Sequence, residues 1–155
     1  MTSSRSRLLC VLALLLAAGS LTEARAQVSV VGGNLLMNVT TGTAGAQPVA
    51  VTNTTATLRF RRENVITKIT VAASCPGQRF SLAVLATNLT YGIAAPQVSL
   101  FNGMLATNFV LSIPTGGTLN KTCTLRYTAS ATFAQGNSTE LGNDVYSITY
   151  TLVAQ

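Results

Sequence analysis

The sequence lacks the residues that enzymes use most often. Its 155 residues include no histidine and no tryptophan, only four acidic residues and three cysteines. General acid–base, nucleophilic and metal catalysis need His, Asp, Glu, Cys or Lys side chains held close together. Glu140 and Asp144 are near each other only in the sequence and have no third catalytic partner. We therefore expect no enzymatic activity, no cofactor and no metal site.

Charge of either sign is also scarce. Charged residues make up 9% of the chain, and the net charge at pH 7 is +6. This basic bias is too mild to indicate a nucleic-acid-binding protein. Thr, Asn, Ser and Gln supply most of the polarity instead, which is typical of a secreted β-protein that contacts neighbouring subunits or glycans.

The first 26 residues have the features of a secretory signal peptide. Arg5 and Arg7 precede an apolar run from Leu8 to Ala18, and Ala24 to Ala26 form a small-residue cleavage site. Its removal takes away three of the ten cations and one of the four acids, and leaves a net charge of +4. No later run approaches the ~20 apolar residues of a transmembrane helix. We expect one secreted domain, 27–155, in the periplasm, on the outer surface or outside the cell.

Two cysteines, Cys75 and Cys123, remain after the signal peptide. A single pair in an oxidising compartment favours one disulfide. Each cysteine has the same parity as the apolar residues of its expected strand, so we expect the bridge to be buried in the core. Closing this loop would stabilise the fold by about 4 kcal/mol.

Alternation of apolar and polar residues with a period of two dominates after residue 27. The clearest run is 122–133, with Cys123, Leu125, Tyr127 and Phe133 on one face, and 144–153 repeats the pattern. Turn residues separate these two runs, which predicts a hairpin or neighbouring strands. Further strands are expected at Val28–Val31, Leu35–Val39, Ala56–Arg61, Val65–Ser74, Arg79–Leu85, Gln97–Phe101 and Asn108–Ile113. The pattern predicts an all-β fold, a single antiparallel β-sandwich of about seven to nine strands.

The densest charge is a cluster of three arginines, Arg59, Arg61 and Arg62. On the outer face of a strand they would form a patch that binds sulfate, phosphate or carboxylate groups. Alternatively, they protect an exposed strand from edge-to-edge aggregation. Phe60 has inward parity, so the patch offers no aromatic platform for nucleic-acid bases.

The N-terminal part of the mature chain is a candidate donor strand. Its apolar residues alternate in two short runs, Val28 and Val30, then Leu35, Met37 and Val39. Either run has the pattern of a strand that adds to a neighbouring subunit. The alternative is a local hairpin through Gly32 and Gly33.

The signal peptide, the cysteine pair, the Thr/Ala/Gly-rich strands and the last alternating run, Asp144 to Val153, together resemble bacterial pilin-like secreted proteins of the spore-coat-U and chaperone–usher types. The resemblance covers the mature chain as a pattern and is closest in that last run. It implies an immunoglobulin-like sandwich whose subunits assemble by donating an N-terminal strand. We therefore expect a non-enzymatic structural subunit of a fimbrium, coat or cell surface. The alternative is a monomeric extracellular module that binds a glycan or an anionic envelope polymer.

Overall fold

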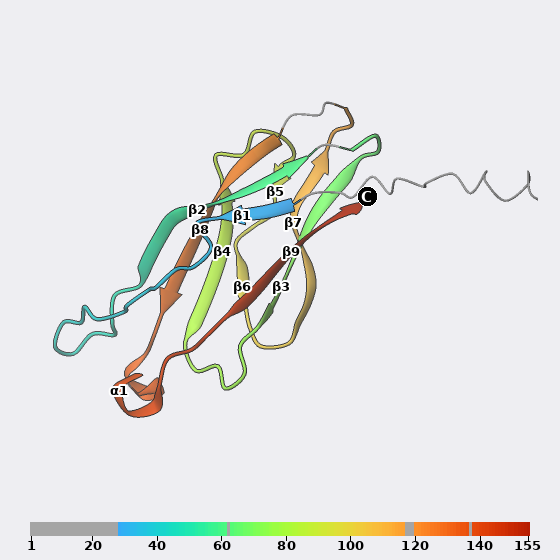
Figure 1. Cartoon of the computed structure of the whole chain (residues 1–155). Coiled ribbons are helices and arrows are strands. Elements are labelled where there is room, and N and C mark those ends of the chain that lie inside the picture. The colour runs from blue at the N-terminus through green and yellow to red at the C-terminus, as the bar shows by residue number, and fades with distance from the viewer. Residues whose placement is uncertain (1–27, 62, 117–119, 137) are drawn as a thin grey trace, which may run out of the picture.

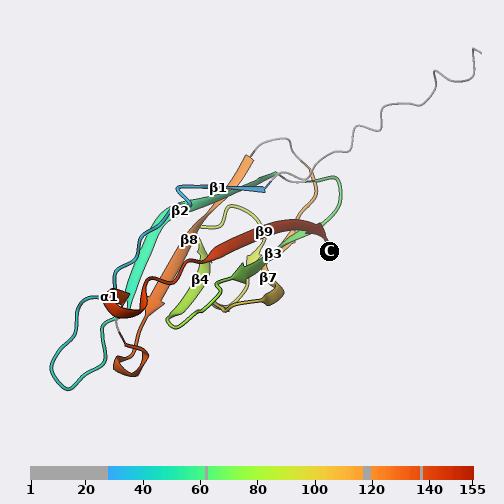
Figure 2. The same cartoon turned by 60° about the horizontal axis from the view of Figure 1, so that its bottom comes forward.

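Two antiparallel sheets make up the fold (Figures 1 and 2). The computed structural model describes residues 28–61, 63–116, 120–136 and 138–155, so the predicted signal peptide lies outside the described residues. Sheet A has the order β1-β2-β8-β4-β6 and sheet B the order β5-β7-β3-β9. Sheet A contains β1 (Val28–Val31), β2 (Val51–Arg61), β8 (Asn120–Ser130), β4 (Ser81–Thr87) and β6 (Val98–Leu100). Sheet B contains β5 (Ile93–Ala94), β7 (Met104–Ile113), β3 (Thr67–Ser74) and β9 (Ser147–Ala154).

The core lies between the two sheets and is built from the inward side chains of both. Leu58 and Leu125 of sheet A and Ile69 and Phe109 of sheet B are at most 1% exposed. Alternate residues of β2, β3 and β8 are buried, as the period-two pattern predicts. The prediction of an all-β, two-sheet sandwich is thus confirmed, with nine strands among the described residues.

The predicted pairing of the last two strands is wrong. Strand β8 lies in sheet A and β9 lies in sheet B, so the chain between them crosses from one sheet to the other. The crossing contains a 3-10 turn, η1 (Phe133–Gln135), and one helical turn, α1 (Ser138–Leu141). Strand β8 ends at Ser130, and Phe133, predicted to be in the core, is 61% exposed.

The predicted hairpin at Gly32 and Gly33 is also wrong. Strand β1 pairs with β2, from Val28 opposite Phe60 to Val31 opposite Thr57. Gly32, at φ +73°, lies against the Thr55 carbonyl, so the chain continues along β2 instead of folding back on β1. Residues Leu35–Val39 therefore follow β1 in the same direction and form no strand.

The predicted disulfide does not form, and Cys75 and Cys123 are buried free thiols. Cys75 follows β3 and is linked by the turn to Gln78 to the start of β4, where Ser81 lies opposite Ser130 of β8. Cys123 precedes Ser130 by seven residues, which is roughly 20 Å along a strand. A disulfide needs Cα atoms within about 7 Å of each other. The parity argument placed both thiols inward but did not show that they lie at different ends of the sandwich.

Candidate functional site

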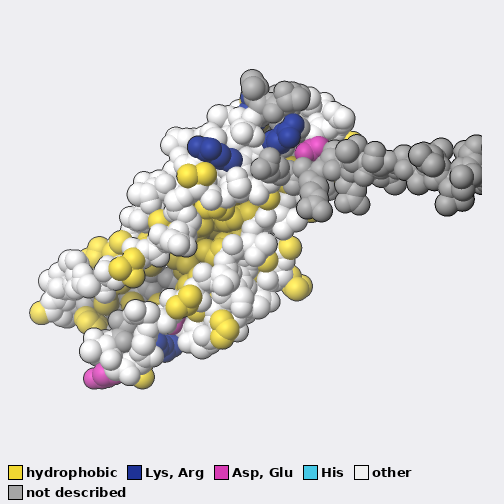
Figure 3. Space-filling view, in the orientation of Figure 1, with side chains coloured by type: hydrophobic (Ala, Val, Ile, Leu, Met, Phe, Trp, Pro, Cys, Tyr) yellow, Lys and Arg dark blue, Asp and Glu magenta, His cyan; other side chains and the backbone are white. Residues whose placement is uncertain are grey.

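A groove of about 1140 Å³ opens between the two sheets on one side of the molecule. We call it the inter-sheet groove. Its apolar lining forms the yellow band through the centre of the surface in Figure 3. Its lining includes the side chains of Leu35, Met37, Leu82, Tyr127, Ile148 and Tyr150. Sheet A supplies Leu82 and Tyr127, sheet B supplies Ile148 and Tyr150, and the chain after β1 supplies the other two.

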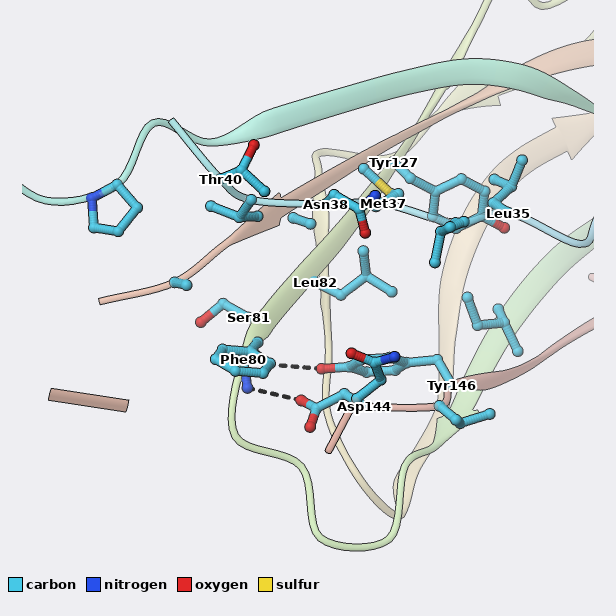
Figure 4. Close-up of a pocket in the computed structure, with 18 of the residues that line it drawn as sticks. Leu35, Met37, Asn38, Thr40, Phe80, Ser81, Leu82, Tyr127, Asp144 and Tyr146 are labelled. Atoms are coloured by element: carbon cyan, nitrogen blue, oxygen red, sulfur yellow. Dashed lines mark hydrogen bonds between the residues drawn. The ribbon is translucent and has the colours of Figure 1, made fainter. Parts of the chain in front are cut away.

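One wall of the groove is segment 33–40, which follows β1. Leu35, Met37 and Val39 are half-buried, while the residues between them are exposed, so the segment has the burial pattern of a strand. Within the described part of the chain, however, it pairs with no strand and makes no backbone hydrogen bond. Figure 4 shows Leu35 and Met37 beside the groove, across from Leu82. The segment rests on the core through side chains alone.

The opposite wall is the free edge of β9. Among the described strands β9 pairs only with β3, so the backbone groups on its other edge belong to no ladder. Strand β1 approaches β9 without pairing with it. Ile148 and Tyr150, in the first half of β9, face the groove. An unpaired edge beside an apolar groove can accept a further strand, because the edge supplies main-chain hydrogen bonds and the groove supplies side-chain pockets.

Two tyrosines connect the sheets at the bottom of the groove. The hydroxyl oxygens of Tyr127, from β8, and Tyr150, from β9, are 2.9 Å apart. The Tyr150 ring also packs against Phe109, with 5.2 Å between the ring centroids. Burial is the main cause that raises the pKa of both phenols above the ordinary value. The pair is therefore neutral at physiological pH, and it links the sheets without adding charge to the groove.

One end of the groove is fixed by the carboxylate of Asp144. Its Oδ2 accepts hydrogen bonds from the backbone N–H groups of Arg79, at 2.9 Å, and Phe80, at 2.7 Å. Its Oδ1 lies 3.7 Å from Nε of Arg79, and the carboxylate side chain is 6% exposed. The Tyr146 hydroxyl donates to the Phe80 carbonyl at 2.8 Å, which ties the chain before β9 to the start of β4 (Figure 4).

The residues predicted as a donor strand come together at the groove. Val30, Leu35, Met37 and Val39 line it, and Val28 packs against the core from β1. The predicted arginine patch lies elsewhere. Arg59 and Arg61 alternate with buried residues of β2, so they are on the outer face of sheet A, away from the groove. Arg62 lies outside the described residues.

Acidic and thiol side chains are among the groups in the described residues that could carry catalysis or bind a metal. No group of three His, Cys, Asp or Glu side chains there could hold a metal ion. Asp144 is engaged by backbone N–H groups and Arg79, whereas Glu140 is exposed on α1. Burial raises the pKa of the Cys123 thiol to about 12, so this group is not a thiolate nucleophile at neutral pH. In the same residues no helix has the length and apolar character needed to span a membrane.

The sequence did not identify Asp144 and Leu82 as parts of a site. Asp144 was considered only as a neighbour of Glu140 and as the first residue of the last alternating run, and Leu82 only for its alternation with polar neighbours. Comparison of the chain with protein-family models, with curated proteins and with solved structures returned no match. The site is therefore interpreted from its own geometry.

Proposed function

We propose that this protein is a non-enzymatic, secreted structural subunit that assembles with copies of itself by strand addition. The observation that carries the proposal is the inter-sheet groove, which lies open beside the unpaired edge of β9. We further propose that the sandwich is immunoglobulin-like, as in the pilin-like proteins that the sequence resembles. Export through residues 1–26 belongs to the same proposal, and sequencing of the mature N-terminus would test it by finding Gln27.

The chemistry of the groove favours an extended segment with alternating apolar residues. A strand added along β9 would repeat its side chains on one face every two residues and would place them over Ile148 and Tyr150. Each backbone hydrogen bond it makes contributes about 0.5–1.5 kcal/mol. Each fully buried Leu, Met or Val side chain contributes about 1.5–3 kcal/mol.

The N-terminal segment of a second copy fits this description. Leu35, Met37 and Val39 have the required spacing, yet in their own chain they are only half-buried and belong to no ladder. If this segment paired with β9 of a second copy, it would gain the backbone hydrogen bonds and the burial that it lacks within its own chain. Transfer of this segment from its own chain to β9 of a second copy is therefore favourable, because the contacts that it makes within its own chain are incomplete.

The test separates the donor from the acceptor. Leu35→Ser/Met37→Ser weakens the donor, and Ile148→Lys places a charge in the acceptor groove. Each variant alone should be monomeric by light scattering, and wild type should form oligomers that resist SDS without heating. Mixing should restore a heterodimer, because each variant retains the half that the other has lost. Leu105→Ser, at a residue 85% exposed on β7, is the matched control and should assemble as wild type does.

Two results would contradict the proposal. One is a wild-type protein that stays monomeric at high concentration and in unheated SDS. The other is assembly by either single variant without its partner. Circular dichroism and a cooperative urea transition establish that each variant is folded, so loss of assembly is not confused with unfolding.

A further inference from the structure

The outer face of sheet A carries three arginines that the groove does not use. Arg59 and Arg61 are on β2, and Arg126 is on the adjacent strand β8. Arg59 and Arg126 are exposed, and each has buried neighbours on both sides, so both point away from the core. Arg126 was not part of the sequence-predicted patch. The pairing of β8 with β2 brings it to the same face, although it is 67 residues from Arg59 in the chain.

None of these arginines is neutralised by a carboxylate in the described part of the chain. The ion pair found there within 4.0 Å joins Arg79 to Asp144, at one end of the groove. Glu63 follows Arg61 by two residues but forms no such pair with it. The positive charge of Arg59 and Arg126 is thus available to a ligand.

The spacing of the arginines suits a ligand with several separated charges. Arg59 lies opposite Thr122, and Arg126 is four residues further along β8, which is roughly 13 Å. At this spacing each guanidinium can engage an anionic group of its own. Between them the strands present hydroxyls, with Thr57 directly opposite Thr124. Cations separated by hydroxyls match a chain of sugars that carries periodic acidic groups.

We infer that this face of sheet A binds a linear anionic polysaccharide bearing sulfate or carboxylate groups. Arginine recognises both groups through two parallel N–H donors, and threonine hydroxyls hydrogen-bond the sugar hydroxyls between them. The outward residues of β2 and β8 include no aromatic side chain on which a base could stack. These features favour a polysaccharide over a nucleic acid.

Retention on immobilised polymers tests the inference, with dextran sulfate and polygalacturonate as anionic probes and dextran as the neutral one. Wild type should bind at least one anionic polymer at low salt, elute as salt rises and ignore dextran. Arg59→Gln/Arg126→Gln should weaken binding about fivefold per arginine removed. Arg59→Lys/Arg126→Lys keeps the charge without the paired donors. Its affinity should fall between those of wild type and the double glutamine variant. Lys68→Gln removes a cation from β3 of sheet B and should bind as wild type does.

Three results would overturn the inference. The first is equal retention on dextran, or none on either anionic polymer. The second is a loss for Lys68→Gln as large as that for a single Arg59→Gln change, since this would report net charge alone. The third is elution from a single-stranded oligonucleotide at higher salt than from the polysaccharides. The site lies on the outer face of sheet A, outside the groove, so these outcomes hold whether or not the chain assembles by strand addition.

Discussion

The hydroxyl pair of Tyr127 and Tyr150 is a buried polar contact that joins strands of the two sheets at the groove. The two residues are 6% and 8% exposed, so a hydroxyl left alone there loses its partner without regaining full hydration. We expect Tyr127→Phe and Tyr150→Phe each to lower the free energy of unfolding by about 1–3 kcal/mol. The double variant should cost less than the sum of the singles, because neither hydroxyl remains. Urea unfolding of the four proteins measures this, and strictly additive losses would show that the hydroxyls are not coupled.

The Cys123 thiol makes stability depend on alkaline pH. Burial raises its pKa from 9.0 to about 12. Below pH 9 the thiol is protonated in both the folded and the unfolded chain, and its contribution to stability is fully present. Between pH 9 and 12 only the unfolded chain ionises, so stability falls by about 1.4 kcal/mol per pH unit for this group.

Urea unfolding of wild type and Cys123→Ala from pH 7 to pH 10 measures that contribution. Cys75 is present in both proteins, and its pKa is also raised, first by burial and then by the charge of Asp144. The decline above pH 9 should therefore be shallower in the variant, though not absent. Parallel curves for the two proteins would show that Cys123 does not titrate in this way.

Among the elements, strands with one buried face were predictable and unpaired segments were not. Tyr150 and Leu152 fall on the inward face of β9 as the alternation predicts, because slipping by one residue would expose them both. Leu35 and Met37 have the same alternation but no neighbour to pair with, so the pattern predicted a strand where the chain is only extended. The alternation of apolar residues indicates which side chains face the core. A strand forms hydrogen bonds in a sheet only if a second strand also lies at hydrogen-bonding distance, and the alternation does not report this.

Asp144 is one of the residues that attach the segment between β8 and β9 to the start of β4. Asp144→Ala removes two backbone hydrogen bonds and leaves the Arg79 guanidinium without its carboxylate. We expect the free energy of unfolding to fall by about 2–4 kcal/mol, and the amides of Arg79 and Phe80 to exchange hydrogen faster than in wild type. Asn143→Ala, at the exposed neighbour, is the control and should change stability by about 0.5 kcal/mol or less. Unchanged exchange at both amides in Asp144→Ala would contradict this role.

At the scale of the whole molecule, the groove exists because segments far apart in the sequence meet. Segment 33–40 and β9 are separated by more than a hundred residues in the sequence, and side chains of both line the groove. The period-two alternation assigned Tyr127 and Tyr150 to the interior. It did not indicate which strands leave a gap between the sheets. For the same reason it did not separate Cys75 from Cys123, since facing inward says nothing about position along the sandwich.

An open apolar groove should be detectable in the native protein as a binding site for an apolar dye. The volume of about 1140 Å³ is large for a small-molecule pocket. At protein concentrations too low for assembly, we expect anilinonaphthalene sulfonate to fluoresce with the folded monomer. Near-ultraviolet circular dichroism and a cooperative unfolding transition then exclude a partly unfolded state as the source. A peptide of residues 28–40 should displace the dye, because it supplies the alternating side chains that the groove accepts. The same peptide with Leu35, Met37 and Val39 replaced by serine is the control and should leave the fluorescence unchanged. If both peptides displace the dye equally, or if Ile148→Lys binds it as wild type does, the dye site is not the groove beside β9.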